Sequence, residues 1–380
     1  MNLSTKTSNT AAGANANETD SLIVLHVAYI TSDFASGVST VVPQYLNEQS
    51  EIKEMNIALL NLTNYRPKDA KYPVFFQSCI EKLPEPFCNP SLVIFHEIYR
   101  PDHIKLSHWL RRRAIPYIIT PHGSLTYVAQ EQHHLAKQLL NVFFYNAFIR
   151  NADCIHFLSE KEAMSSNGFK HRKASIIPNG VSIPKAKASN LDSRIALFIG
   201  RLDIEVKGLD LLIKSLPLIA DELRGLGAKI YIYGPDEDGS MAKLELLIAD
   251  NQVSDIVLLN GPVNGQSKAD AFLKSQFYIQ LSRTEGFPTS VLEALAYGLP
   301  IIVTEGTTWK ETANNKGIGI GVESDLEAIS NAILTLFNDD ELRCKLANAA
   351  RKYAIEHFQW KAIAKRQFIL YRDIVNGLSN

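Results

Sequence analysis

The chain has 380 residues, of which 46% are hydrophobic and 21% charged, and its formal net charge is −1. This length exceeds one ordinary core and suits two domains, and the composition is that of a globular protein rather than a disordered or fibrous one. The nearly neutral balance supplies no global field that would attract nucleic acid or anionic lipid. We therefore expect no nucleic-acid partner.

The four cysteines are scattered and form no CxxC pair, which argues against a metal or disulfide framework and for reduced thiols. No apolar run approaches the ~18 residues that a membrane span needs. Residues 1–20 are rich in Asn, Thr, Ala and Ser and lack the apolar region of a secretory signal, which predicts a flexible tail. We expect a cytoplasmic protein.

Short apolar runs alternate with helical patterns along the chain, which predicts βαβ units and parallel sheets. In the first half the candidate strands are Leu22–Tyr29, Asn56–Asn61, Leu92–Phe95, Tyr117–Thr120, Cys154–Phe157 and Ala174–Ile177. Each run ends in polar residues or in Gly and Pro. Because ligands of doubly wound sheets bind beyond the carboxyl ends of the strands, these ends are the candidate sites.

The segment Ser182–Asp192 has no apolar period and is predicted to be a linker. The pattern then restarts, with a helix over Leu209–Ala220 and an amphipathic last helix over Trp360–Val375. The candidate strands of this half are Ile195–Ile199, Ala228–Tyr233, Ile256–Leu259, Phe277–Leu281 and Pro300–Thr304. We expect an N-terminal domain over residues 21–184 and a C-terminal domain over residues 185–360.

Two glutamates flank a predicted helix start in the second half. Glu285 follows a strand, and Glu293 lies within the first turns of a helix that Thr289 or Ser290 could cap. Such a helix start attracts phosphate, and a carboxylate just beyond it can bind a ribose diol. From spacing alone, Glu285 could equally be an exposed loop carboxylate and Glu293 a partner of the helix dipole.

A strand-to-helix loop places two cations near each other. The stretch from Phe198 to Leu209 runs from a strand into Gly200 and carries Arg201 and Lys207 before a new helix. Together these side chains could neutralise a diphosphate leaving group, since Arg offers a planar fork and Lys a mobile charge. The alternative is two solvated surface cations.

Two loops of the first half add weaker signals. Gly37, in the loop Ser32–Thr40, would allow the backbone to approach a phosphate closely. His122, at the end of a buried strand, could bind a sugar hydroxyl or carry a proton, or it could simply pack or cap.

Two segments bear on partners. The cluster Trp109–Arg113 is basic beside an aromatic residue, and the predicted helix over Leu135–Ile149 is apolar on more than one face. Either could touch the inner face of the cytoplasmic membrane, where a lipid-linked acceptor would lie. The alternatives are a solvated charge run and a buried helix.

In their common order these segments resemble the retaining glycosyltransferases of family 4 with the GT-B architecture, over most of the chain from Leu22 to Tyr371. The likeness in the second half is carried by Gly200-Arg201, Lys207-Gly208, and Glu285 through Glu293 and on to Ala296, Gly298 and Pro300. In the first half it is carried by the Gly37 loop, His122-Gly123 and Ile177–Val181.

The resemblance implies two Rossmann-like domains that face each other across a cleft, with the last helix, residues 361–380, crossing back to the first domain. It implies that Arg201 and Lys207 bind the diphosphate, that Glu293 holds the ribose and that Glu285 contacts the transferred sugar. The implied catalytic side chains are His122, Arg201, Lys207 and Glu285. The implied donor-binding residues are Gly37, Gly200, Val263, Gly286, Phe287, Pro288, Thr289, Ser290 and Glu293.

The chain departs from the family pattern at two places. The first loop of the family often has two adjacent glycines, whereas Ala35-Ser36-Gly37 leaves one. Pro288 has no N–H, so a backbone donor that many relatives offer at this point is absent, and only Phe287 or Thr289 can supply it.

The resemblance implies a retaining hexosyltransferase of the bacterial polysaccharide-biosynthesis type. We expect it to move a hexose, with glucose favoured, from a UDP-sugar to a saccharide or lipid-linked saccharide acceptor, with no cofactor and no metal. The alternatives are a nucleotide-sugar epimerase on the same fold and a non-catalytic nucleotide-sugar-binding subunit.

Overall fold

The computed structural model describes residues 21–32, 37–131, 139–166, 168–188, 193–236 and 238–377. The predicted tail, residues 1–20, lies outside this range. So do residues 33–36 of the first loop, residues 132–138, which overlap the start of the predicted apolar helix, and residues 189–192 of the predicted linker.

The first sheet has seven parallel strands in the order β3-β2-β1-β4-β5-β6-β7. The strands are β1 (Leu22–Ala28), β2 (Met55–Asn61), β3 (Val74–Phe75), β4 (Leu92–His96), β5 (Tyr117–Thr120), β6 (Cys154–Phe157) and β7 (Ala174–Ile176). The strand order reverses between β1 and β4, which is where a doubly wound sheet opens a crevice at its carboxyl edge.

The second sheet has six parallel strands in the order β10-β9-β8-β11-β12-β13. They are β8 (Ile195–Ile199), β9 (Lys229–Tyr233), β10 (Val257–Asn260), β11 (Phe277–Gln280), β12 (Ile301–Thr304) and β13 (Gly319–Val322). Here the order reverses between β8 and β11. The loops after these two strands carry Arg201 and Glu285, so both residues sit at the switch point.

Helices cover both faces of each sheet. In the first half these are α1 (Gly37–Gln49), α2 (Pro101–Arg112), α3 (Tyr127–Glu131), the π-helical turn η2 (Asn141–Tyr145), α5 (Asn146–Asn151) and α6 (Glu160–Ser165), with a 3-10 turn η1 (Ile80–Lys82). In the second half they are α7 (Leu209–Ser215), η3 (Leu216–Ile219), α8 (Ala220–Leu226), α9 (Ser240–Asp250), α10 (Gly265–Lys274), α11 (Thr289–Tyr297), η4 (Glu305–Thr307), α12 (Lys310–Lys316), α13 (Leu326–Asn338) and α14 (Asp340–Phe358). Because both faces are covered, the strands read as continuous apolar runs.

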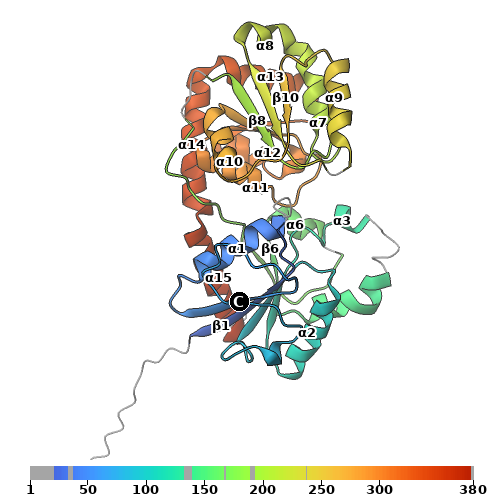
Figure 1. Cartoon of the computed structure of the whole chain (residues 1–380), viewed down its shortest axis with the longest axis vertical. Helices are drawn as coiled ribbons and strands as arrows, with labels where there is room; N and C mark the ends of the chain where they lie inside the picture. Colours follow the sequence, from blue (N-terminus) through green and yellow to red (C-terminus); the bar gives the residue numbers. More distant parts are fainter. Residues whose placement is uncertain are drawn as a thin grey trace, which may run out of the picture.

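The last helix, α15 (Trp360–Val375), returns to the first domain. Figure 1 shows α14 beside the second sheet and α15, in red, lying against α1 and β1 in the other lobe. Trp360, Ile363 and Tyr371 belong to the same buried core as Val24 and Val42. The helix break at Gln359 is therefore the point where the chain crosses between the domains.

The two segments that connect the domains, at Val181 and at Gln359, lie side by side. The Val181 N–H, on the segment that leaves the first domain, donates to the Phe358 carbonyl at 2.7 Å, and Val181 forms a bridge with Gln359. A Cβ on Gly180 would lie 2.4 Å from the Trp360 ring, so only glycine allows the two segments this approach.

The predicted fold class, two parallel-sheet α/β domains with the last helix crossing back, is confirmed. The predicted domain boundary falls between β7 and β8 and stays a prediction. The helix expected over Leu209–Ala220 ends as α-helix at Ser215 instead, because Pro217 in the next turn lacks an N–H and obstructs the preceding turn. The short strands β3 and β13 were missed, since two apolar residues or a Gly-Ile-Gly stretch give no strand pattern.

Candidate functional site

The second sheet brings a cation and a carboxylate together at its switch point. Lys207, in the loop between β8 and α7, forms an ion pair with Glu285, in the loop after β11. Only 14% of the Lys207 side chain and 13% of the Glu285 side chain are exposed. The residues are 78 positions apart in the sequence, so the tertiary fold alone creates this pair.

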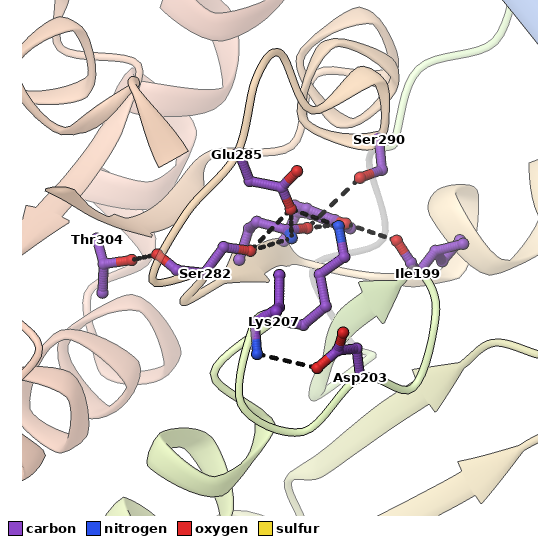
Figure 2. Close-up of polar contacts among 10 residues, drawn as sticks. Ile199, Asp203, Lys207, Ser282, Glu285, Ser290 and Thr304 are labelled. Atoms are coloured by element: carbon purple, nitrogen blue, oxygen red, sulfur yellow. Dashed lines mark hydrogen bonds and ion pairs between the residues drawn. The ribbon is translucent and has the colours of Figure 1, made fainter. Parts of the chain in front are cut away.

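A small set of polar side chains orients the Glu285 carboxylate. Ser282 Oγ donates to Glu285 Oε1 at 2.9 Å, and Gln280 Nε2 donates to the same oxygen at 3.2 Å. Gln280 is fixed in turn, since its Oε1 accepts from Tyr278 Oη at 2.8 Å. Figure 2 shows Lys207 and Ser282 converging on Glu285, while Thr304 donates to the Ser282 carbonyl at 2.8 Å. The carboxylate is thus held in one place.

The Lys207 loop is placed by a glycine. Gly208 has φ +66°, in the left-handed region, and a Cβ there would lie 2.0 Å from the Leu281 carbonyl oxygen. Next to it, Arg283 forms a two-pronged pair with Asp210, at 2.8 and 2.9 Å, that ties the β11 loop to the start of α7. These contacts set the distance between the two loops that carry Lys207 and Glu285.

Helix α11 begins directly after the Glu285 loop. Pro288 is its N-cap, with φ −71° and ψ 107°, so the first-turn amides of Thr289 and Ser290 have no acceptor within the helix. Phe287 packs against Trp309, with ring centroids 5.9 Å apart. The start of α11 therefore presents backbone donors and the positive end of its dipole to the switch point.

Glu293 lies on α11 and has a partner that sequence reasoning missed. Lys268, on α10, contacts both of its carboxylate oxygens, at 2.7 and 2.6 Å. The Glu293 side chain is 29% exposed. Val263, between β10 and α10, packs against the same core cluster as α11 and so lies in this neighbourhood.

The remaining candidates occupy the expected strand and helix ends. Arg201 follows β8 and is exposed, and the Gly200 N–H donates to the Tyr233 carbonyl at 3.0 Å. Gly37 is the exposed first residue of α1, and open space surrounds the position of its missing Cβ. Nothing in the described residues therefore requires glycine at position 37.

His122 stands at the end of β5 in an unusual backbone conformation. Its φ is +51°, and that of Gly123 is +84°. The turn is held by Glu162 of α6, a buried carboxylate that accepts from the Gly123 N–H at 2.6 Å and from the Leu158 N–H at 2.7 Å. Burial raises the pKa of the Glu162 carboxyl, against the effect of these two hydrogen bonds.

The two domains meet beside this turn. A Cβ on Gly286 would lie 3.6 Å from Gly123 Cα, so the His122 turn faces the Glu285 loop. Ser159 Oγ donates to the Gly286 carbonyl at 3.4 Å, and Lys161 Nζ donates to the Glu305 carbonyl at 2.8 Å. The structure thus places His122 of the first domain opposite Glu285 of the second.

Sequence reasoning named the ends of strands but missed the side chains that orient them. Glu162 and Lys268 lie 39 and 25 positions away from the residues that they contact, whereas Gln280 and Ser282 lie within five positions of Glu285. Gln280 alone gives a sequence signal, as a polar residue at the end of an apolar strand. Among the residues described, no three His, Cys, Asp or Glu side chains gather closely enough to hold a metal ion.

Both halves of the chain match known protein families. Residues 38–184 match the family described as Glycosyltransferase Family 4, and residues 182–353 match the one described as Glycosyl transferases group 1. The two matched segments adjoin, and their junction lies on the predicted linker.

Similar proteins include one curated relative and two solved structures. A GDP-mannose:cellobiosyl-diphosphopolyprenol alpha-mannosyltransferase of Xanthomonas oryzae pv. oryzae is 28% identical over 204 residues, 52% of either chain. The chain spans about half the length of such curated relatives. Sucrose-phosphate synthase from Thermosynechococcus elongatus has a TM-score of 0.74 at 17% identity, covering 93% of this chain and 99% of that one. Anabaena Alr3699/HepE, solved in complex with UDP and glucose, has a TM-score of 0.70 at 15% identity, covering 93% and 100%.

Proposed function

Since this chain belongs to the GT-B glycosyltransferases, with a family 4 domain followed by a group 1 domain, we propose that it transfers a hexose from UDP-hexose with retention of configuration. Glucose is the favoured sugar, and the acceptor is a saccharide or a lipid-linked saccharide in polysaccharide biosynthesis. The observation that carries this proposal is the Lys207–Glu285 pair beside the start of α11 and opposite His122.

The site supports departure of a nucleoside diphosphate. Negative charge grows on the leaving phosphate as the bond to the sugar breaks, and fixed positive charge stabilises that state. Lys207, Arg201 and the first-turn amides of α11 supply such charge. Because these groups already neutralise the diphosphate, we propose that no metal ion is needed. Turnover that disappears with a chelator and returns with Mg²⁺ would refute that part.

Glu293 and Glu285 bind opposite ends of the nucleotide-sugar donor. Glu293 accepts hydrogen bonds from the ribose diol, and Lys268, which contacts both of its oxygens, orients its carboxylate. Glu285, fixed by Ser282 and Gln280, contacts the transferred sugar. Glu285 also balances the Lys207 charge through its ion pair, a role that the diphosphate of a bound donor would share.

Retention follows from attack on the face that the nucleotide leaves, through an oxocarbenium-like transition state. The leaving phosphate oxygen takes the proton of the acceptor hydroxyl, and Glu285 serves sugar binding rather than covalent chemistry. Closure of the two domains over the donor limits its hydrolysis, because it excludes water.

The choice of donor and acceptor in this proposal is based on the ligands named for similar proteins. UDP and glucose are named for the Anabaena structure, and a saccharide on a diphosphopolyprenol is named for the Xanthomonas relative. We further propose that the first domain contacts a membrane surface through η2, where Val142 and Phe143 are each 69% exposed and Phe144 is 52% exposed. None of the helices in the described ranges is long and apolar enough to cross a bilayer.

The test is incubation with UDP-glucose, alone and with short saccharide acceptors, followed by anomer analysis of the product. We expect an α-linked product from the α-linked donor and no epimerised nucleotide sugar in the donor-only sample. A β-linked product would refute retention. Epimerised free donor would establish the epimerase instead, and binding with neither hydrolysis nor transfer would indicate a non-catalytic subunit.

A further inference from the structure

A chain of buried hydrogen bonds leads from His122 into the first domain. His122 Nε2 lies 3.0 Å from His96 Nδ1, and His96 Nε2 lies 3.0 Å from His26 Nδ1. His26 Nε2 lies 2.9 Å from Gln49 Oε1. His26, His96 and Gln49 are fully buried, and they come from β1, the end of β4 and the end of α1. Packing alone does not require three imidazoles in line.

The chain continues to a backbone carbonyl. Gln49 Nε2 donates to Tyr371 Oη at 3.3 Å and to Gln367 Oε1 at 2.8 Å, both on α15. Tyr371 Oη lies 3.2 Å from Tyr45 Oη, which lies 3.3 Å from His156 Nδ1. His156 Nε2 lies 2.7 Å from the carbonyl oxygen of Ile177.

The Ile177 carbonyl fixes the tautomer of His156. A carbonyl oxygen only accepts, so His156 carries its proton on Nε2 and leaves Nδ1 as an acceptor for the hydroxyls of Tyr45 and Thr120, each at 3.3 Å. The Gln49 amide fixes the direction on the His122 side. Its Nε2 donates to Gln367 Oε1 and Tyr371 Oη, so its Oε1 faces His26, and His26, His96 and His122 in turn carry their protons on Nε2.

The rings are neutral, as this reasoning requires. Burial lowers the pKa of His26 and of His122 to about 3 and that of His156 to about 4, and it holds the pKa of His96 well below its usual value. Each ring thus carries one proton near neutral pH, and a chain of such rings has a single direction.

We propose that this chain of hydrogen bonds, called the relay below, fixes the tautomer of His122. The Nδ1 of His122 then presents a bare lone pair to the saccharide and accepts a hydrogen bond from a sugar hydroxyl. Imidazole nitrogens point in diverging directions, and Nε2 is engaged by His96. Within the described residues, no protein hydrogen bond engages His122 Nδ1. The role given to the hydroxyl rests on the proposed function; the tautomer does not.

His96, His26 and Gln49 are positioning residues in this account, because they act on the saccharide only through His122. Gln367 and Tyr371 hold the far end of the relay from the crossing helix α15. Without an acceptor at Gln49, the His26 proton loses its partner, and His122 would populate both tautomers. Only one of them accepts from a hydroxyl, so turnover falls.

The direct test is long-range ¹H–¹⁵N NMR of the full chain labelled with ¹⁵N-histidine near neutral pH, since the ¹⁵N shifts distinguish a protonated ring nitrogen from a bare one. Single His→Gln variants assign the signals. We expect His122, His96, His26 and His156 all to carry the proton on Nε2. A proton on His122 Nδ1 would overturn the inference, with no need for any variant of the relay to fold.

Kinetics test the consequence. Gln49→Leu should lower kcat about tenfold, the cost of one hydrogen bond in the transition state, while KM for the donor changes little. Gln44→Leu is the matched control: it lies on the same helix and also loses a bond to α15, from Trp360 Nε1 at 3.0 Å, but it lies outside the relay. We expect its kcat and its His122 tautomer to be unchanged.

The two proposals fail separately. An active transferase with the His122 proton on Nδ1 would overturn the relay and leave the function standing. The expected tautomers in a folded Gln49→Leu variant, with unchanged kcat, would also overturn the relay. The expected tautomers in a chain that transfers no sugar would support the relay and refute the proposed function.

Discussion

Lys207 is largely buried in its ion pair with Glu285, so its replacement tests the role of one fixed positive charge. Lys207→Ala should lower turnover at least ~10²-fold, because it removes a fixed charge from the leaving phosphate. Arg201→Ala should act in the same direction. Steady-state kinetics with the donor measure both effects. Lys214→Ala is the control, because this lysine lies on the adjacent helix α7, is 49% exposed and faces Asp210. Near-normal transfer by Lys207→Ala would refute the leaving-group role.

A Glu293 variant tests nucleotide binding separately from the chemical step. Glu293→Ala should weaken the affinity for free UDP, because it removes the acceptor for the ribose diol, by about tenfold for a charge-assisted bond. Calorimetric titration with UDP alone measures this without turnover. The control is Glu327→Ala, on helix α13, where the carboxylate serves no proposed ligand. Equal UDP affinity in the Glu293 variant and the wild type would count against the ribose role.

The sequence predicted residue positions better than residue partners. Arg201, Lys207 and Glu285 lie in loops that follow strands, and Glu293 lies in the second turn of a helix, positions that a linear pattern indicates. The pairing of Lys207 with Glu285 and of Glu293 with Lys268 depends on how strands β8, β10 and β11 are ordered in the sheet. No local pattern carries that order, so these partners could not be predicted.

At the scale of elements, the loop between β8 and α7 depends on its glycine. Gly208→Ala should lower stability by ~1–3 kcal/mol and lower turnover too, because a Cβ would collide with the Leu281 carbonyl in a left-handed conformation. Urea unfolding measures the free energy. Gly225→Ala in α8 is a control of opposite sign: it has open space and no positive φ, and should stabilise by ~0.5–1 kcal/mol. An unaffected Gly208→Ala would show that the loop does not need this geometry.

The element pattern was readable because parallel strands buried on both faces are continuous apolar runs. The elements that the sequence did not predict are those whose form depends on nearby residues or neighbouring strands. Pro217 divides the expected helix into α7, η3 and α8, and β3 owes its two residues to pairing with β2. The sequence did not predict the relay of His26 and His96 for the same reason. A histidine within an apolar strand does not reveal which side chain of the neighbouring strand contacts its ring.

At the scale of the molecule, the buried histidines predict a pH dependence. Their pKa values are depressed when folded, to about 3 for His26, His103 and His122, against 6.5 in the unfolded chain. The unfolded state therefore binds protons that the folded state does not as pH falls below 6.5, and stability is lost toward acid pH. Each ring contributes at most ~1.4 kcal/mol per pH unit. Urea unfolding between about pH 7 and pH 5 measures the slope, and equal stability across that range would contradict it.

The switch point of the second sheet should bind a nucleotide sugar at Lys207, Glu285 and Glu293. A thermal-shift panel of UDP-, GDP- and ADP-sugars tests it most directly, because a ligand that binds only the folded state raises Tm by mass action. We predict the largest rise with a UDP-hexose, and its loss in Glu293→Ala but not in Glu327→Ala. No rise with any nucleotide sugar, or a rise that survives Glu293→Ala unchanged, would contradict the account.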